Sequence, residues 1–419
     1  MNQKSNRFKK KAVNIKSTKT SVKFARTDKK QNLSLFVSEY QRVVSEFVDL
    51  LWPMVDVPKM VDKKLSANIQ TWLSARAIQA AGKQASGIVR GTRTKQAKRL
   101  YQINKFKSQG MHKKARKLQA IYNKNTCSKP DVKSVKPELD SRFVTIKFCE
   151  TGEFDGWVIL GSLGGGLSIR IPFKKTKHFN KMLVNGRIKS CIRLSKNDLT
   201  FMFEFDMPKR VESGEVLGID VGQNEAISCS NGQVISKDCH GHSYKSICEK
   251  LSRKKKGSKA FKKAEAHRSN YINWSVNQLD LSGIKIVRRE NIKNMRKCKR
   301  VNRKLSHWNY AELFDRLDSK LNDAGVQIVK ICSTYTSQRC SSCGWVRKGN
   351  RKGKLFKCLS CGFTLDSDLN AAKNISFELP AISKEQRLKN ENRTGFYWLS
   401  LEQEFIVSAA LKQQEFENE

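Results

Sequence analysis

The feature that most constrains this chain is a pair of CxxC motifs within residues 335–375. Cys340 and Cys343 form the first motif, and Cys358 and Cys361 form the second. A CxxC turn directs two thiolates at one centre, and two such turns supply the tetrahedral sulfur set that zinc prefers. A redox CxxC usually occurs singly, within a thioredoxin-like strand and helix. The spacing therefore predicts a structural zinc ribbon.

The charge of the chain points to a polyanionic partner. Of its 419 residues, 82 are Lys or Arg and 38 are Asp or Glu, which gives a net charge of +44. Self-repulsion of this size is normally neutralised by a polyanion, and nucleic acid is the common one. No apolar run reaches the ~18 residues that span a bilayer, and no apolar segment of a signal peptide follows the charged amino terminus. We therefore expect a nucleic-acid-binding protein without a membrane partner.

The cysteines outside the two motifs are scattered along the chain. Scattered cysteines beside a metal motif indicate a reducing compartment rather than a disulfide framework. We expect a cytoplasmic protein, associated with the nucleoid in a prokaryote, or a nuclear protein in a eukaryote.

The first half of the chain divides by periodicity into three parts. Residues 1–30 are basic and predict a disordered arm or one or two short strands. Residues 31–126 have apolar positions at helical spacing, with a first helix that ends at Trp52 before a proline and a second that Ser66 would cap. Residues 127–212 begin as a linker and continue as short β-branched and aromatic runs, which predict a small antiparallel barrel or sandwich.

Basic residues cluster at three places along the chain. Residues 90–117 carry many lysines and arginines and no acid, with Tyr101 and Phe106 interleaved. Such helix-borne charge suits a phosphate-lined groove with occasional base stacking. The candidate nucleic-acid contacts come from this stretch, from a lysine run and from a later loop: Arg90, Arg93, Lys95, Lys98, Arg99, Lys254, Lys255, Lys256, Arg296 and Arg300.

The second half of the chain predicts a mixed sheet. Residues 213–335 contain three strand-like runs, of which the last two meet at an Asn231-Gly232 hairpin turn, then a basic helical stretch and a strand ending at Glu290. The zinc ribbon occupies residues 336–362, and residues 363–378 contain a short helix.

The carboxyl-terminal tail, residues 379–419, is richer in acid than in base. Its aromatic and apolar residues predict a helix with one apolar stripe, which either docks on the protein or stays exposed. The stripe consists of Phe396, Trp398, Leu401 and Phe405.

Three acids follow or end the elements of the predicted sheet. Asp220 alternates with apolar neighbours in LGIDVG, Glu290 closes IKIVRRE, and Asp368 begins a helix. A buried acid between apolar neighbours is costly unless it is paired or binds a cation. Their order along the chain is that of an RNase H-like fold, whose acids can hold two magnesium ions about 4 Å apart. Asp366 competes for this role, and we interpret it as a helix cap or an outer residue of the site.

The motifs GIDVG, the late Glu290, TSQRCSSCG…CLSCG and DSDLNAAKNI together resemble the TnpB family and its relatives, the compact type V CRISPR effectors and the eukaryotic Fanzor proteins. The resemblance implies a multidomain α+β protein with a RuvC-like nuclease domain of RNase H fold at residues 213–335 and 363–378. The four-cysteine zinc ribbon is inserted in that domain and binds target nucleic acid. A helical recognition domain and a β-barrel wedge domain, to which residues 1–30 also contribute, come first.

The same resemblance implies a magnesium-dependent DNA endonuclease whose catalytic residues are Asp220, Glu290 and Asp368. A guide RNA, transposon-derived or CRISPR-type, would pair with double-stranded target DNA beside a short flanking motif. Two departures from the family pattern, RREN at Glu290 and Ser367 in DSDLN, remove no ligand. An unguided RuvC-like resolvase or transposase-associated nuclease and an RNA-guided repressor that does not cleave stay open as alternatives.

Overall fold

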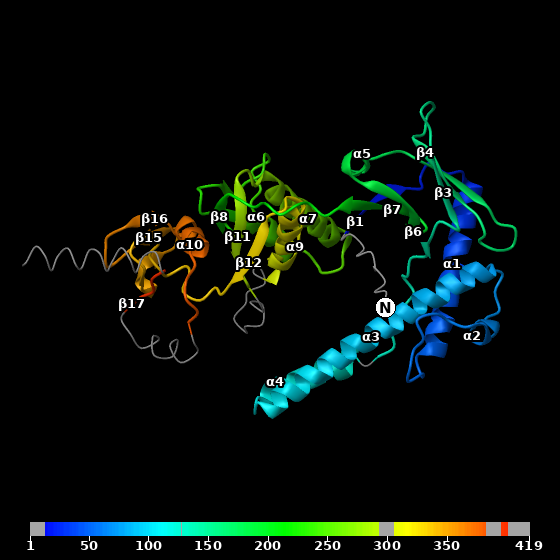
Figure 1. The fold of residues 1–419 in the computed structure, drawn as a ribbon, viewed down its shortest axis with the longest axis horizontal. Helices are drawn as coiled ribbons and strands as arrows, with labels where there is room; N and C mark the ends of the chain where they lie inside the picture. Colours follow the sequence, from blue (N-terminus) through cyan, green and yellow to red (C-terminus); the bar gives the residue numbers. More distant parts are fainter. Residues whose placement is uncertain (1–12, 127, 293–305, 383–394, 401–419) are drawn as a thin grey trace, which may run out of the picture. The chain divides into compact units, whose positions relative to one another are not determined.

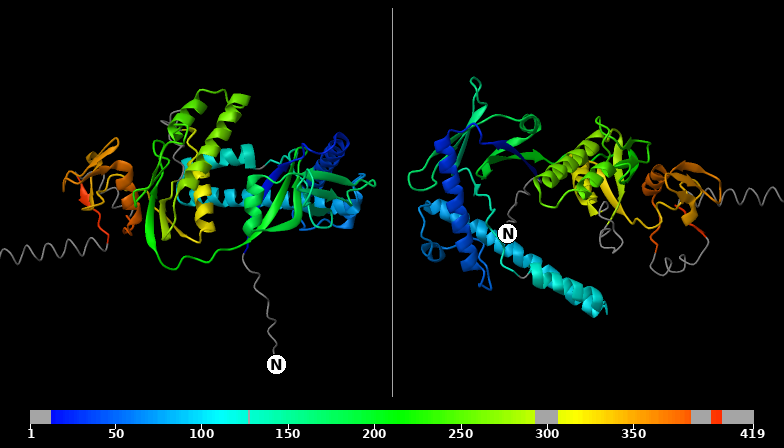
Figure 2. Two further views of the ribbon diagram at one scale, coloured as in Figure 1. Left: turned by 90° about the horizontal axis from the view of Figure 1, so that it is seen from above. Right: turned by 180° about the vertical axis from the view of Figure 1, so that it is seen from behind.

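A computed structural model describes residues 13–126, 128–292, 306–382 and 395–400, which are drawn in colour in Figures 1 and 2. The chain forms two compact units, Met1–Asp206 and Met207–Glu419. No helix among the described residues is long and apolar enough to cross a membrane. The protein therefore combines helices and sheets in more than one unit, and each unit is described by itself below.

The first unit contains two antiparallel sheets (Figure 1). The four-stranded sheet has the order β1-β7-β6-β2, so the amino-terminal strand pairs along its whole length with β7. The three-stranded sheet has the order β3-β4-β5. The β-barrel expected here, with a sandwich as its alternative, is therefore not seen as a closed barrel, because no ladder joins the two sheets among the described residues. The strands are β1 Val13–Ser21, β2 Glu138–Leu139, β3 Val144–Phe148, β4 Gly156–Leu160, β5 Ile169–Phe173, β6 Arg187–Leu194 and β7 Asp198–Asp206.

The helices of the first unit are dominated by two long ones. Helix α1 buries its predicted stripe and ends at Leu51, as the following Trp52-Pro53 pair predicts. The predicted cap Ser66 is wrong: Ser66 lies inside a short helix that Asp62 caps, and the long helix α3 is capped by Ser74. The helices are α1 Thr27–Leu51, α2 Lys63–Ala67, α3 Ala75–Ser108, α4 His112–Ile121 and α5 Lys177–Asn185, with a π-helical turn, η1, at Tyr122–Thr126.

The second unit is built on a five-stranded sheet of order β10-β9-β8-β11-β12. Strand β8 pairs in parallel with β11, and β11 in parallel with β12, while β9 and β10 form the antiparallel side. The Asn231-Gly232 turn joins β9 to β10 as predicted. The strands are β8 Glu215–Asp220, β9 Ile227–Cys229, β10 Val234–Ile235, β11 Ile284–Glu290 and β12 Gln327–Ile331.

Helices cover the two faces of this sheet. Figure 1 shows α10 on one side of the sheet and α6, α7 and α9 on the other. Alternation along β8 explains the arrangement: Leu217 and Ile219 face the apolar core with α7 and α9, whereas Gly218 meets the backbone of α10. The helices are α6 Tyr244–Ser252, α7 Lys259–Gln278, α9 Tyr310–Asp323 and α10 Ser367–Ser376.

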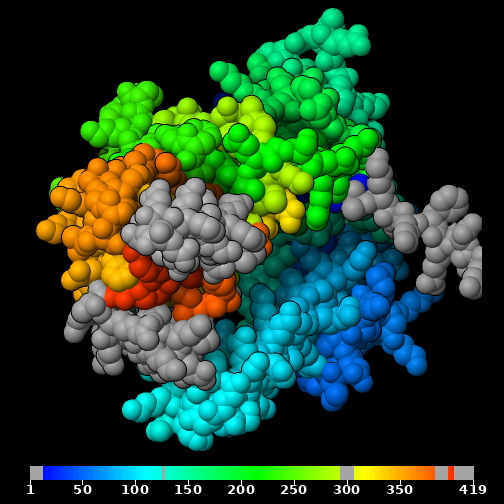
Figure 3. All heavy atoms as spheres, turned by 60° about the vertical axis from the view of Figure 1, so that its left-hand side comes forward, coloured from blue at the N-terminus to red at the C-terminus, as the bar shows by residue number. Residues whose placement is uncertain are grey.

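The cysteine-rich region forms small hairpins directly before α10, and its orange residues lie at the surface of the second unit in Figure 3. Its elements are β13 Trp345–Val346, the 3₁₀ turn η3 Lys348–Asn350, β14 Arg351–Lys352, β15 Leu355–Lys357 and β16 Thr364–Asp366. Strand β13 also pairs with β17, Phe396–Tyr397, from the tail. The predicted tail helix is thus wrong at Phe396, because these residues complete a sheet edge, while Leu401 and Phe405 lie outside the described residues.

Candidate active site and zinc centre

Asp220 and Glu290 end neighbouring parallel strands. Arg289 on β11 is paired with Ile219 on β8, so Glu290 lies beside Asp220 one residue further along. Both side chains point to the face that α10 covers, since their neighbours Ile219 and Arg289 point to the opposite face. The sheet therefore places these two carboxylates side by side at the carboxyl ends of its strands.

Asp368 reaches the same place from α10. It lies in the first turn of this helix, which Asp366 caps by accepting hydrogen bonds from the backbone N–H groups of Asp368 and Leu369. Asp366 is thus a cap, as interpreted from the sequence. The α10 helix packs on β8 so closely that a Cβ at Gly218 would lie 2.0 Å from the carbonyl oxygen of Ala372. This packing brings the helix that carries Asp368 against the strand that carries Asp220.

The charges of the three acids act on one another. Burial raises the pKa of Asp220 well above its usual range, and the nearby carboxylates of Glu290 and Asp368 raise it further, against a smaller lowering by Arg351. Burial also raises the pKa of Glu290, while a hydrogen bond from Thr336 lowers it. The Thr336 hydroxyl donates this bond to Oε1 of Glu290 over 2.6 Å. Three acids with mutually unfavourable charge are a donor set for a hard divalent cation, which would relieve the repulsion.

Two basic residues of the ribbon form ion pairs with Asp368. The β14–β15 hairpin brings Arg351 Nη2 to 2.9 Å from Oδ1 of Asp368 and Lys354 Nζ to 2.8 Å from Oδ2. Lys354 Nζ also lies 2.8 Å from Oε1 of Glu225. Burial would lower the pKa of Lys354, but its hydrogen bonds to Asp368 and Glu225 raise it. Sequence reasoning missed Arg351 and Lys354 as partners of Asp368, and Glu225 as a partner of Lys354, because only the folded ribbon brings these side chains together.

The two arginines in RREN anchor Glu290 rather than compete with it. Arg288 donates to the carbonyl oxygen of Ser376 at the end of α10, which ties β11 to that helix. Arg289 is buried on the other face, makes two hydrogen bonds to Asp318 of α9 and stacks over the Phe314 ring at 4.1 Å. The Arg288 guanidinium therefore points to α10 on one face of the sheet, and the Arg289 guanidinium points to α9 on the other.

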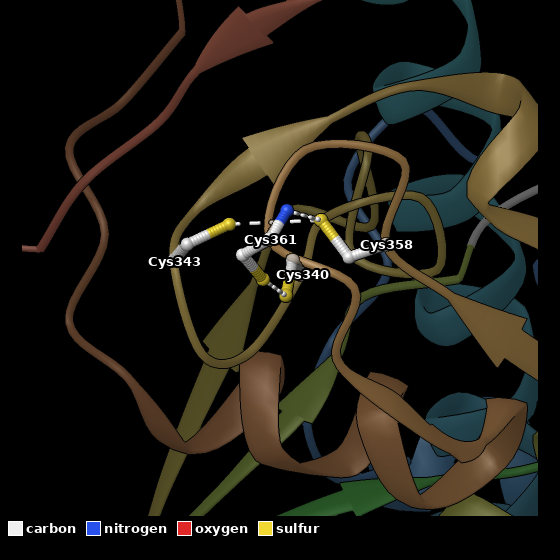
Figure 4. Close-up of side chains that lie close together, drawn as sticks. All are labelled: Cys340, Cys343, Cys358 and Cys361. Carbon is white, nitrogen blue, oxygen red and sulfur yellow. Dashed lines mark hydrogen bonds between the residues drawn. The ribbon is translucent and has the colours of Figure 1, made fainter.

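The four predicted cysteines converge on one centre (Figure 4). Cys340 Sγ lies 3.8 Å from Cys361 Sγ, and Cys343 Sγ lies 3.6 Å from Cys358 Sγ. Tetrahedral zinc with bonds of about 2.3 Å requires sulfur separations of about 3.8 Å. The set therefore fits zinc. Among the described residues it is the only group of three or more Cys, His, Asp or Glu whose ligand atoms all lie within 4.8 Å of one another, so the carboxylates of the candidate active site are spaced more widely.

Arg339, beside the first cysteine, joins the ribbon to α10. It is fully buried, and it donates to Oδ1 of Asn374 over 2.6 Å and to the carbonyl oxygen of Trp398 over 2.6 Å. Asn370 accepts from the backbone N–H of Ser341 and donates to the carbonyl oxygen of Arg339. Burial lowers the pKa of Arg339 to about 10. The zinc turn and the helix that carries Asp368 are thus held together by buried hydrogen bonds that the sequence did not reveal.

Most candidate nucleic-acid contacts are surface residues. Arg90, Lys95 and Lys98 are exposed on α3, whose cyan carboxyl-terminal part is visible in Figure 3. Arg93 instead donates to the carbonyl oxygens of Trp52 and Val55, near the end of α1. Arg99 and Lys254 are partly exposed, Lys255 and Lys256 are exposed, and Arg296 and Arg300 lie outside the described residues.

The carboxyl-terminal region matches a known family model. The model of the Cas12f1-like TNB domain matches residues 310–375, which contain the four cysteines and Asp368. A CRISPR-associated endodeoxyribonuclease Cas12f1 from Sulfoacidibacillus thermotolerans is 37% identical over 125 residues, which are 30% of this chain and 28% of that protein. The putative RNA-guided DNA endonuclease InsQ of Escherichia coli (strain K12) is 36% identical over 84 residues, 20% of this chain and 21% of that protein. The matched part thus spans about a third or less of each relative.

A solved structure resembles the fold over most of the chain. The C2c1 protein of Alicyclobacillus acidoterrestris, in complex with single-guide RNA, superposes with a TM-score of 0.54 at 8% sequence identity. The match covers 90% of this chain and 88% of that one. Its identity is low, so this likeness concerns the multidomain α+β fold alone.

Proposed function

We propose that this chain, as a relative of the TnpB and Cas12f1 nucleases, is an RNA-guided DNA endonuclease. In this proposal a guide RNA pairs with one strand of a target DNA beside a short flanking motif, and a RuvC-like site hydrolyses the phosphodiester backbone. The observation that carries the proposal is the meeting of Asp220, Glu290 and Asp368 at one end of a sheet, from three distant parts of the sequence. The strand order, with three parallel strands and an antiparallel side, supports the RuvC-like assignment.

The three acids would hold the catalytic cations. Magnesium bound by these carboxylates would supply the Lewis-acid chemistry of phosphodiester hydrolysis. Thr336 orients the Glu290 carboxylate, and the packing of α10 on β8 holds Asp368 near Asp220. The zinc ribbon has a structural part in this proposal, because four thiolates leave no open coordination position for chemistry.

Basic residues would grip the nucleic acids by charge and shape. Helices α3 and α4 pack on each other, bury Ile103 and Ala115, and expose lysines and arginines along their length. A surface of this kind binds phosphates without reading sequence, which suits a guide whose base pairing supplies the specificity. The lysines at 254–256 would steer a single strand toward the acids.

The test starts from what copurifies with the full chain when it is expressed with its native flanking locus. We expect one defined small RNA, and magnesium-dependent cleavage of double-stranded DNA that carries its complement beside a flanking motif. Asp220→Asn should abolish cleavage. Asp315→Asn, a matched change at an exposed position of α9, should not. Cleavage without any bound RNA would favour the unguided resolvase, and guided DNA binding without cleavage would favour the repressor.

A further inference from the structure

Lys354 is shared between two acids from different parts of the second unit. Its Nζ atom lies 2.8 Å from Oδ2 of Asp368 on α10 and 2.8 Å from Oε1 of Glu225, in the turn between β8 and β9. Asp366 is a more distant neighbour, at 3.7 Å. Glu225 is largely shielded from solvent, with 20% of its side chain exposed, and its second oxygen, Oε2, has no hydrogen-bond partner among the described residues. One ammonium group thus serves an acid of the candidate trio and a fourth acid outside it.

The two basic residues paired with Asp368 differ in the partners that they would keep if that acid bound a cation. Arg351 pairs with Oδ1 of Asp368, and its other recorded bond is a 3.3 Å contact to the carbonyl oxygen of Gly353. Lys354 already contacts Glu225 and can leave Asp368 without losing an ionic partner. The N–H of Ser367 donates a 2.8 Å hydrogen bond to the Lys354 carbonyl oxygen, which holds the Lys354 backbone in place while the side chain moves. A rotation of the flexible lysine stem is enough.

A divalent cation and an ammonium group compete for one carboxylate. The cation carries twice the charge, so its Coulomb attraction to the Asp368 carboxylate is stronger than that of the lysine. A cation bound to Asp368 also repels the Lys354 ammonium. Without a second acid nearby, displacement would leave a charged lysine unpaired beside a metal ion. Glu225 removes that penalty, because it already offers Lys354 a carboxylate oxygen at hydrogen-bond distance.

We propose that Lys354 and Glu225 are positioning residues of the active site: Lys354 neutralises Asp368 until a divalent cation displaces it, and Glu225 then holds the displaced ammonium. The proposal rests on the proposed function, since it requires Asp368 to bind the cation. It assigns to the ribbon hairpin a direct part in setting the metal affinity of the site. Neither residue needs to touch the cation for this role.

The first test measures Mn²⁺ binding to the zinc-loaded full chain by electron paramagnetic resonance of the unbound ion. Lys354→Met should bind Mn²⁺ roughly three- to tenfold more tightly than wild type, because the competing charge is gone. Lys352→Met is the matched control, since Lys352 is an exposed lysine of the same hairpin that forms no ion pair with any described residue. It should leave the affinity within roughly twofold of wild type. Equal effects of the two substitutions would overturn the proposal.

A double-mutant cycle separates the role of Glu225 from that of a direct ligand. Glu225→Gln should weaken Mn²⁺ binding in the wild-type background, because Lys354 then has only Asp368 as a strong partner. The same substitution should have little effect in the Lys354→Met background. If Glu225→Gln weakens binding by the same factor in both backgrounds, Glu225 acts on the cation without Lys354. The proposal that Glu225 holds the displaced Lys354 ammonium is then wrong.

A measurement on the unaltered protein removes any dependence on how the variants fold. Acylation of amines, followed by mass spectrometry, should increase at Lys354 when Mn²⁺ is added and stay constant at Lys352. Unchanged labelling of Lys354 at saturating Mn²⁺ would contradict displacement.

The Asp220→Asn variant distinguishes failure of the proposed function from failure of the Lys354 proposal. If this variant binds Mn²⁺ as wild type does, both the proposed function and the Lys354 proposal are wrong. If binding depends on Asp220 but the Lys354 tests fail, only the inference falls.

Discussion

The hydroxyl group of Thr336 donates a 2.6 Å hydrogen bond to Oε1 of Glu290, although 46 residues separate them in the chain. Thr336 is buried, so this bond fixes one oxygen of a carboxylate whose pKa burial raises and the bond itself lowers. Thr336 is the first residue of the zinc ribbon, and its carbonyl oxygen accepts a hydrogen bond from Asn374 of α10. One residue thus links the strand with the second acid to the helix with the third.

Thr336→Val should shift the pH dependence of cleavage. Removing the donor removes stabilisation of ionised Glu290, so the pKa of Glu290 rises and the carboxylate loses its charge at a higher pH. A hydrogen bond to a charged group contributes about 1.5–3 kcal/mol, so the acid limb of the rate profile should move up by about one to two pH units. Thr336→Ser keeps the donor and should restore the wild-type profile. Identical profiles for valine and threonine would show that the bond does not tune the site.

Asp220→Asn should stabilise the protein in the absence of divalent cations, while it abolishes cleavage. Burial and two neighbouring carboxylates raise the pKa of Asp220 in the folded state above its unfolded value. Below the unfolded pKa, about 4, the carboxyl is neutral in both states and the substitution changes little. As the pH rises toward the folded pKa, the wild type loses stability that the asparagine variant keeps.

Thermal unfolding of the zinc-loaded protein from pH 4 to pH 8, after dialysis into magnesium-free buffer, measures this difference. The melting temperature of Asp220→Asn should exceed that of wild type by an amount that grows with pH. Added magnesium should stabilise the wild type and close the gap. Asp315→Asn, on the exposed face of α9, provides the baseline. A gap that shrinks as the pH rises would contradict the raised pKa.

The sequence predicted the elements whose signals are local. The strands that end at Asp220 and Glu290, the Asn231-Gly232 turn and the four-cysteine set each depend on residues within a short window. The amino-terminal strand and the tail were ambiguous, because a strand such as β17 forms only when a partner edge is present. The short helix α5 was missed within a stretch otherwise rich in β signals.

The candidate site was predicted in its acids and missed in their partners. An acid between apolar neighbours stands out in a sequence, whereas Arg351, Lys354 and Glu225 look like ordinary surface charges until the hairpin folds onto α10. The buried Arg339 also lacks a local signal, since its hydrogen bonds reach residues 35 and 59 positions away. Predicting such contacts requires the tertiary packing that a single sequence does not state.

Zinc removal should loosen α10 as well as the ribbon. Burial raises the pKa of the Cys340 thiol to about 11, so this thiol is protonated without metal and the turn loses its centre. The hydrogen bonds of Ser341 and Arg339 to α10 then lose their fixed partner. Hydrogen–deuterium exchange should increase across residues 335–376 after chelation or in Cys361→Ser. Cys332→Ala, at an exposed cysteine outside the cluster, should exchange as wild type does. Protection of α10 that survives zinc loss would mean that the ribbon does not order Asp368.

Gly218→Ala should separate α10 from the sheet. The added methyl group would lie 2.0 Å from the carbonyl oxygen of Ala372 and 2.5 Å from the nitrogen of Ser376, and a helix backbone cannot yield as a side chain does. Overpacking of this kind costs about 1–3 kcal/mol, and here it also moves Asp368 away from Asp220. We therefore expect a lower free energy of unfolding together with a loss of cleavage far larger than the stability change explains at a temperature where the variant stays folded. Gly87→Ala is the matched control, because no atom apart from its chain neighbours and its own helix backbone lies within 4 Å of its added methyl, and a helix interior favours alanine by about 1 kcal/mol. A Gly218→Ala variant that cleaves at the wild-type rate would show that the close packing of α10 on β8 does not position the third acid.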